Sequence, residues 1–336
     1  MTRTLAGKLV LLSLLTAGLH SVGTAAEPAW PSKPIRMLIP LAAGGATDQA
    51  ARTMAAELSK ILGQQVVAEN VTGASGAIAL QRLANADPDG YTLGATANSL
   101  HTVAPHTSSL PYDAMRDFSL IGTYASFEYA LVTAADSPFT SVADLLDRAR
   151  QSPGLVTYGS SGVGTGNHLA GALLGQLAGV EFNAIPYRGG SPAMVDVLAG
   201  RTDFMFDVLG ASVPLIKGGK SKALGTSGKE RSRALPDVPT IAETVPDYES
   251  GGWFALIGPR GLPDEIIDKL NGALNQVLQT PDYRQRLADM GYDILAGSPA
   301  DLSERMASEY KKWGEVVDKL PCPSIPERCP SDSASK

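Results

Sequence analysis

Ile35-Arg36-Met37-Leu38-Ile39-Pro40 decides the fold, because it runs directly into a glycine-rich turn, residues 41–48, and then a helical pattern from Gln49. Its apolar character is typical of a buried strand. Residues 155–158 repeat the plan and run through a second glycine-rich turn, residues 159–168, into a second helix. A helix N-terminus after such a turn offers unpaired N–H groups and a positive dipole end. Two such units predict two lobes that hold a carboxylate between them.

The rest of the chain alternates apolar, strand-like runs with helical patterns, which predicts an α/β fold. The helix after the first turn carries an apolar face and stops at Gly63. Ser298-Pro-Ala-Asp301 has the spacing of a capping box and predicts the start of a C-terminal helix. Further strands are expected at residues 65–69, 91–95, 129–133, 204–206, 223–226 and 254–257.

Residues 1–26 have the pattern of a signal peptide. Arg3 and Lys8 precede a short apolar run, residues 9–15, and small residues lead to a cleavage point after Ala26. The alternatives are a buried helix or a membrane anchor, but the run is much shorter than the ~20 residues a span needs. We therefore expect a protein that is exported and soluble after cleavage. We also expect it to be a monomer.

Charge and cysteine content narrow the function further. The chain has 28 basic and 34 acidic residues, and this acidic balance disfavours nucleic acid or anionic lipid as a partner. Cys322 and Cys329 are the two cysteines, and both lie in the C-terminal tail, residues 321–336. In an exported protein such a pair indicates a disulfide rather than a metal site.

Many short motifs resemble those of one family, the periplasmic solute-binding proteins of tripartite tricarboxylate transporters (the Bug or TctC type). The similarity extends over nearly the whole chain after residue 26. The motifs that carry it are Trp30-Pro-Ser-Lys-Pro-Ile-Arg36, Pro40 with Ala43-Gly44-Gly45 and Asp48, Gly63-Gln-Gln-Val-Val67, Pro88-Asp-Gly-Tyr-Thr-Leu93, Leu110-Pro-Tyr-Asp113, Tyr158-Gly-Ser-Ser-Gly-Val-Gly-Thr165 with His168, Ile185-Pro-Tyr187 and Leu235-Pro-Asp-Val-Pro-Thr240.

The resemblance implies a type II periplasmic binding protein fold, with two α/β lobes joined by two crossing strands and the ligand cleft between them. We place the crossings near residues 120–126 and 223–227. Lobe one would then comprise residues 27–125 plus 228–320, and lobe two residues 126–227. The resemblance also implies that the two glycine-rich loops hold a ligand carboxylate, partly through water.

The first loop is expected to bind through its backbone. Ala43, Gly44 and Gly45 would present N–H groups, while Thr47 or Asp48 could instead cap the helix. Direct contact by the Asp48 carboxylate is disfavoured because it repels an anion. Where this chain has Leu41 the family usually has an aromatic residue, which weakens the case for aromatic packing on the ligand.

In the second loop we expect the hydroxyls of Ser160 and Thr165 to donate to carboxylate oxygens, alongside Gly164. The alternative is a flexible turn in which Thr165 caps the helix. His168 lies one turn into that helix and is as consistent with packing as with ligand binding.

Three further candidates follow strands. Asp207 closes the strand at 204–206 and could cap the next helix; the resemblance instead places it at the cleft, facing water or a ligand amine or hydroxyl. Asn98 and Ser99 follow the strand at 91–95 and suit the far end of the ligand.

Patterns of catalysis are absent from the sequence. Gly219-Lys-Ser221 lacks the leading glycine of a phosphate loop, no nucleophile elbow occurs, and the histidines lack metal-ligand spacing. We therefore predict no enzyme activity, no cofactor and no metal. The predicted function is capture of a small carboxylate for the permease subunits of a tripartite transporter. A sensor that presents the ligand to a receptor protein is the alternative, and a hydrolase is a weaker third.

Overall fold

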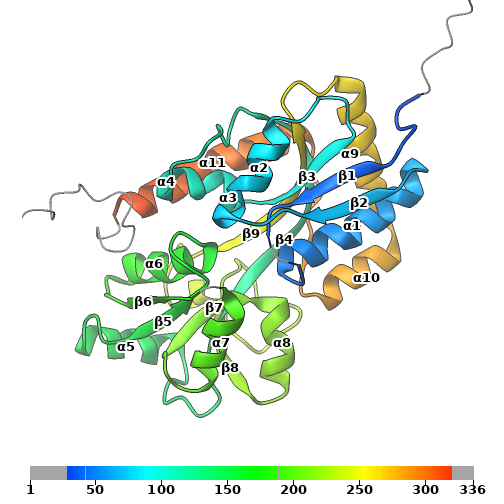
Figure 1. The fold of residues 1–336 in the computed structure, drawn as a ribbon. Helices are drawn as coiled ribbons and strands as arrows, with labels where there is room; N and C mark the ends of the chain where they lie inside the picture. Colours follow the sequence, from blue (N-terminus) through cyan, green and yellow to red (C-terminus); the bar gives the residue numbers. More distant parts are fainter. Residues whose placement is uncertain (1–28, 42, 188, 320–336) are drawn as a thin grey trace, which may run out of the picture.

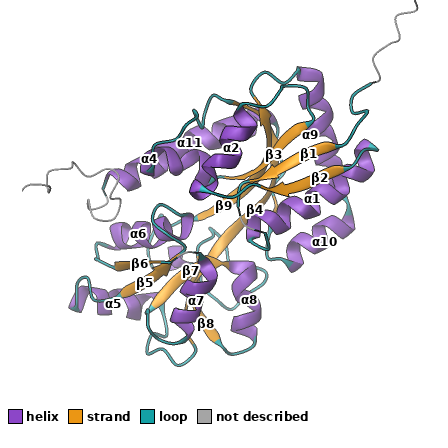
Figure 2. Cartoon of the chain, viewed as in Figure 1, coloured by secondary structure: helices purple, strands orange, loops and turns teal. Residues whose placement is uncertain are grey.

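The computed structural model describes residues 29–41, 43–187 and 189–319. The expected signal peptide and both cysteines lie outside these residues. Two α/β lobes lie end to end, and helices cover both faces of the strands in each (Figures 1 and 2). The strands follow the order β2-β1-β3-β9-β4-β7-β5-β6, with β10 and β8 also paired to β4. The predicted α/β fold is confirmed.

The first lobe is built on strands β1, β2, β3 and β9. β1 pairs in parallel with β2 and β3, while β9 is antiparallel to β3. Its elements are β1 (Ile35–Ile39), α1 (Ala46–Leu62), β2 (Val66–Asn70), the 3-10 helix η1 (Ala74–Gly76), α2 (Ala77–Ala84), β3 (Thr92–Ala97), α3 (Ser99–Thr102), α4 (Ala104–Thr107), β9 (Gly251–Pro259), α9 (Asp264–Gln279), α10 (Pro281–Asp289), β10 (Asp293–Ile294) and α11 (Pro299–Asp318).

The second lobe is built on parallel strands β5, β6 and β7. Its elements are α5 (Val142–Gln151), β5 (Thr157–Ser160), α6 (Gly166–Ala178), β6 (Asn183–Pro186), α7 (Gly190–Leu198), β7 (Phe204–Val208), α8 (Leu209–Lys217), β8 (Ser221–Thr226) and the 3-10 helix η2 (Ile241–Glu243). Because the carboxyl ends of parallel strands share one edge, the loops that follow β5, β6 and β7 gather at one end of the lobe.

One long strand, β4 (Phe118–Ala134), runs through both lobes. It pairs with β9 from Phe118 to Glu128, and with β7 and β8 from Tyr129 to Ala134. The crossing therefore lies at Glu128–Tyr129, slightly beyond the expected residues 120–126.

The return crossing comes later than we expected. Residues 223–226 of the expected crossing belong to β8, which pairs with the second-lobe half of β4. Ile241, Val245 and Tyr248 also pack in the core cluster of the second lobe, with Tyr158 and Phe206. The chain reaches the first lobe again only where β9 begins, at Gly251. This packing favours assigning residues 228–250 to lobe two, and the lobe boundaries otherwise stay a prediction.

Helix α11 also joins the lobes. It begins at the expected capping box, in which Ser298 accepts from the Asp301 backbone N–H and the Asp301 carboxylate accepts from that of Ser298. Its first turns bury Leu302 and Met306 against the first lobe. Farther along, Trp313, Val316 and Val317 pack into the second-lobe cluster.

Helix α1 follows the predicted pattern closely. Its apolar face is buried and includes Ala51, Met54, Ala55 and Leu58. The helix ends at Gly63, which adopts the left-handed conformation with a φ of 67°. Ile61, expected on the same face, is 37% exposed. The N-terminal end of α1 lies at the junction with the second lobe (Figure 1). Among the described residues, no helix is both long and apolar enough to cross a membrane.

Candidate functional site

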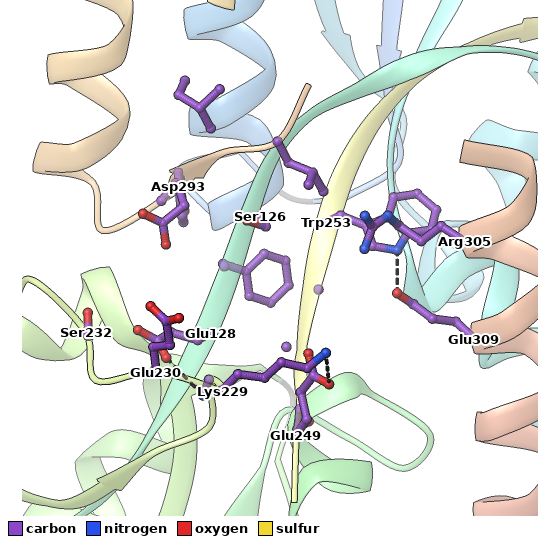
Figure 3. Close-up of a pocket in the computed structure, with 18 of the residues that line it drawn as sticks. Ser126, Glu128, Lys229, Glu230, Ser232, Glu249, Trp253, Asp293, Arg305 and Glu309 are labelled. Carbon is purple, nitrogen blue, oxygen red and sulfur yellow. Dashed lines mark hydrogen bonds and ion pairs between the residues drawn. The ribbon is translucent and has the colours of Figure 1, made fainter. Parts of the chain in front are cut away.

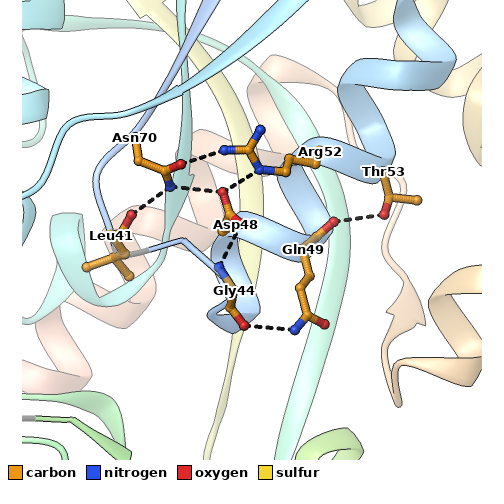
Figure 4. A network of polar contacts seen from close by, with 7 residues as sticks. All are labelled: Leu41, Gly44, Asp48, Gln49, Arg52, Thr53 and Asn70. Atoms are coloured by element: carbon orange, nitrogen blue, oxygen red, sulfur yellow. Dashed lines mark hydrogen bonds and ion pairs between the residues drawn. The ribbon is translucent and has the colours of Figure 1, made fainter.

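The first glycine-rich loop is held in shape by the carboxylate of Asp48 (Figure 4). Asp48 Oδ2 accepts from the N–H of Gly44 at 2.9 Å. Its Oδ1 accepts from Arg52 Nε at 2.8 Å and from Asn70 Nδ2 at 2.9 Å. Asn70 Nδ2 also donates to Leu41 O at 2.9 Å, so both arms of the loop are tied to one network.

This network keeps Asp48 ionised. Burial by itself would raise the pKa of Asp48, but hydrogen bonds from Gly44 and Asn70 and the charge of Arg52 outweigh it, and the pKa is lowered. The Asp48 side chain is 5% exposed, so it is occupied inside the loop. Its role in this structure is to position the backbone.

That positioning leaves the start of α1 open to an anion. Neither Thr47 nor Asp48 caps the helix: the N-cap is Gly45, and no side chain makes a capping hydrogen bond. Ala43, Gly44 and Gly45 are exposed, whereas Thr47 is buried. The exposed backbone at a helix N-terminus is a site at which a carboxylate is stabilised.

The second loop has the same open helix start, but its hydroxyls are engaged. Thr165 is the N-cap of α6, and its side chain makes no capping bond. Thr165 Oγ1 lies 2.7 Å from Gly162 O and 2.7 Å from Asn167 Oδ1. Ser160 is fully buried, with its hydroxyl 3.4 Å from Gly162 N. The side chains we expected to donate to a ligand have partners within the loop.

Asn167, which the sequence reasoning missed, holds this loop together. Its Oδ1 accepts from the N–H of Ser161 at 3.2 Å, and its Nδ2 donates to Ser161 Oγ at 2.8 Å. Ser161 Oγ lies close to Gly190, at the start of α7, where a Cβ atom would be 3.4 Å from it. An Asn two residues beyond a glycine-rich turn is the signal that could have found it.

His168 shapes the loop from inside. Its Nδ1 accepts from the N–H of Gly164 at 3.1 Å, so this nitrogen carries no proton. Burial lowers the pKa of His168 to about 4, and the side chain is 2% exposed. Gly164 itself adopts a φ of 74°, and a Cβ there would lie 2.9 Å from Thr107 Oγ1 of the first lobe. The loop therefore needs a neutral imidazole at position 168 to accept the hydrogen bond and a glycine at position 164 to adopt this backbone conformation.

We expect His168 to make stability depend on pH. Its folded pKa of about 4 lies below the ordinary value of 6.5, so the unfolded chain binds a proton between these pH values while the folded chain does not. The contribution of neutral His168 to the free energy of unfolding is therefore fully present above pH 6.5 and is lost as the pH falls towards 4. Between pH 7 and pH 4, the free energy of unfolding measured with denaturant should fall by about 3 kcal/mol more in wild type than in His168→Asn. Equal losses in the two proteins would contradict this role.

Asp207 lies near the end of β7, close to the start of α7. Ser212 Oγ donates to Asp207 Oδ2 at 2.7 Å, and burial raises the pKa of this carboxyl. A Cβ on Gly190 would be 3.9 Å from Asp207 Oδ1, beside Ser161. Helix α7 starts here without a side-chain cap. The loops after β5, β6 and β7 thus converge on one place.

The Asn98 side chain is bonded to β9 and α11. Its Nδ2 donates to Gly251 O at 3.3 Å and to Glu309 Oε2 at 3.1 Å, and Trp253 Nε1 donates to Glu309 Oε1 at 2.8 Å. These bonds fasten α11 to the crossing strand β9. Ser99 is half-buried at the start of α3. In this structure Asn98 acts on the junction between the lobes.

A groove of about 1480 Å³ lies on the crossing strands, between α10 and α11 (Figure 3). The residues that line it come from β4, residues 228–233, 249–253, α10, residues 292–295 and α11, and none belongs to a glycine-rich loop. Charges of both signs line it, including Glu128, Lys229, Glu249 and Arg305. The sequence did not predict this groove because it is assembled from distant segments. Because a helix N-terminus stabilises an anion, we take the two glycine-rich loops as the candidate site.

No group of three or more His, Cys, Asp or Glu side chains that could hold a metal ion occurs in the described part of the chain. The donors gathered at the loops are backbone N–H groups, hydroxyls and amides. Such a set suits reversible binding of an anion.

Comparison with known proteins identifies the family. Residues 50–321 match the model of the tripartite tricarboxylate transporter family receptor, TctC. A protein encoded in the tcbD–tcbE intergenic region of Pseudomonas sp. (strain P51) is 36% identical over 291 residues, 86% of this chain and 87% of that one. BugT of Bordetella pertussis is 32% identical over 320 residues, 94% of this chain and 97% of that one.

Comparison with solved structures gives the same family. An R. palustris protein with adipate has a TM-score of 0.80 and 35% identity, covering 86% of this chain and 97% of that one. MatC of Rhodopseudomonas palustris with bound malate has a TM-score of 0.77 and 31% identity, covering 86% and 100%. The periplasmic binding protein BugD has a TM-score of 0.77 and 31% identity, covering 86% and 98%. The chain therefore belongs to the TctC family of tripartite tricarboxylate transporter receptors, which are solute-binding proteins of the Bug type and not enzymes.

Proposed function

We propose that this protein captures a small carboxylate in the periplasm, between the N-termini of α1 and α6, and delivers it to the permease of a tripartite tricarboxylate transporter. One observation carries the proposal: each lobe ends a strand in a glycine-rich loop that leads into a helix without a side-chain cap. Both loops are shaped by buried groups, Asp48 in one and His168 in the other.

The expected binding energy must come from several donors together. A helix terminus contributes about 0.3–1 kcal/mol, up to ~2 when partly buried, whereas micromolar affinity needs about 8 kcal/mol. Hydrogen bonds to a charged group contribute roughly 1.5–3 kcal/mol each. Four or so backbone N–H donors from the two helix starts, brought together as the lobes close, are enough.

The ligands of the relatives support a carboxylate as the ligand of this protein, and they favour a ligand with two carboxylate groups. Adipate and malate, bound in two related structures, are both aliphatic dicarboxylates. Two helix N-termini, one in each lobe, would suit such a ligand, with one carboxylate at each. Leu41, half-buried on the first loop, adds an apolar surface suited to an aliphatic chain.

Thermal unfolding tests the proposal. The protein without residues 1–26 should be screened against mono-, di- and tricarboxylates, including adipate and malate. A ligand present at a hundred times its Kd stabilises the fold by about 2.7 kcal/mol, which raises the melting temperature by several degrees. We expect dicarboxylates to give this rise and their diamides to give none. A rise with sugars, nucleotides or metal ions alone would contradict the proposal.

A further inference from the structure

Tyr129 lies where β4 changes partners, and its hydroxyl reaches the second binding loop. A Cβ atom placed on Gly166, the first residue of α6, would overlap the Tyr129 hydroxyl and lie 3.5 Å from Cζ. Glycine at position 166 therefore leaves room for this hydroxyl at the helix N-terminus.

The Tyr129 ring is held firmly and its hydroxyl is unused. Phe127 and Phe206 pack edge-on against the ring, with centroids 5.6 and 6.5 Å away. The residue is only 6% exposed. Within the described residues we find no hydrogen-bond partner for the hydroxyl, whereas the buried hydroxyls of Tyr158 and Tyr248 donate to His168 O and Ala170 O on α6. A donor without a protein partner, at a helix start that no side chain caps, is free to donate to an acceptor on a ligand.

The backbone of Tyr129 belongs to the hinge. Its N–H donates to Ser227 Oγ at 2.7 Å, and its carbonyl accepts from the Ser227 N–H at 2.9 Å. The Ser227 hydroxyl donates in turn to Ser250 O, and the Ser250 N–H donates to Ser227 O at 3.1 Å. Tyr129 thus connects the start of α6 with Ser227 and, through Ser227, with Ser250 at the junction between the lobes.

We infer that the Tyr129 hydroxyl is a ligand contact: it donates a hydrogen bond to the carboxylate held at the N-terminus of α6, and couples that carboxylate to the hinge. This inference rests on the proposed function and adds a residue outside the two glycine-rich loops. Burial, and secondarily the nearby Asp207 carboxylate, raise the pKa of Tyr129, so the hydroxyl keeps the proton it donates.

Tyr129→Phe tests the inference, because it removes the hydroxyl and keeps the ring. Calorimetric titration with adipate and with malate should show about tenfold weaker binding, the loss of one hydrogen bond to a charged group. The melting temperature without ligand should stay within a degree or two of wild type, since the hydroxyl has no protein partner to lose. Tyr248→Phe is the matched control: it should lower the melting temperature and leave affinity unchanged.

Gly166→Ala gives a second test of the same contact, because its methyl group would displace the hydroxyl. It should weaken binding in wild type and have less effect in the Tyr129→Phe background. If wild type binds and Tyr129→Phe binds equally well, the hydroxyl is not a ligand contact and this inference fails alone. If wild type binds neither adipate nor malate nor any other carboxylate, the proposed function fails and takes this inference with it.

Discussion

Ala46→Pro is expected to weaken carboxylate binding ten- to a hundredfold while leaving the protein as stable as wild type. Ala46 is the first residue of α1, and its N–H is among those the helix leaves unpaired. Proline removes that N–H and suits the first helical position, where its fixed φ fits. Gly45, with φ of −77° and ψ of 171°, already has the extended backbone a residue before proline adopts. The loss corresponds to one hydrogen bond to a charged group, about 1.5–3 kcal/mol.

Calorimetric titration and thermal unfolding of the same samples separate the two effects. Ala46→Gly is the matched control, since it removes the side chain and keeps the N–H; it should bind as wild type does. If Ala46→Pro also binds like wild type, the backbone at the start of α1 does not hold the ligand. If it unfolds at a much lower temperature, the variant reports on the fold and Ala46→Gly alone cannot support the account.

Among substitutions in the first lobe, Asp48→Ala should lower both the free energy of unfolding and the carboxylate affinity most. The substitution leaves the Gly44 N–H, Asn70 and Arg52 without their shared acceptor. Losing a buried acceptor costs about 1–3 kcal/mol, and the exposed Arg52 adds little because solvent screens its charge. We expect the free energy of unfolding to fall by about 2–3 kcal/mol and carboxylate affinity to fall more than tenfold, because the loop loses its fixed shape.

Glu57→Ala is the matched control on the same helix. Glu57 is a second buried carboxylate of α1, bonded to Lys60 and to Arg286 of α10, at the end far from the loop. It should lower stability and leave affinity nearly unchanged. Equal losses of affinity in the two variants would mean that Asp48 acts through general stability alone. Denaturant unfolding and titration of both proteins decide between these outcomes.

The fold was predictable where local chemistry determines it. The two strand–loop–helix units, the end of α1 at Gly63 and the capping box at Ser298 depend on residues near one another in sequence. The return crossing was not, because η2 and Tyr248 could belong to either lobe until their apolar side chains found a core. The same holds for the end of α11, where Trp313 packs across the junction.

The candidate site was predictable for backbone and not for side chains. Glycine-rich turns before helices predict N–H donors whatever the surroundings. Whether the hydroxyl of Thr165 faces a ligand depends on its neighbours, and here Gly162 and Asn167 engage it. The sequence reasoning missed Tyr129 because an aromatic residue in an apolar strand is typical of a core position. Only the packing of β4 against α6 brings its hydroxyl to the loop.

Amide NMR of protein labelled with 15N-glycine tests the central claim most directly, that both glycine-rich loops hold one ligand. Titration with adipate or malate should shift the resonances of Gly44 and Gly45 in the first lobe and of Gly162, Gly164 and Gly166 in the second. Because one ligand bridges the lobes, both sets should saturate at the same concentration. Shifts confined to one loop would contradict the clamp. Shifts at Gly228, Gly251 and Gly252, with the loop glycines unmoved, would place the ligand in the groove on the crossing strands instead.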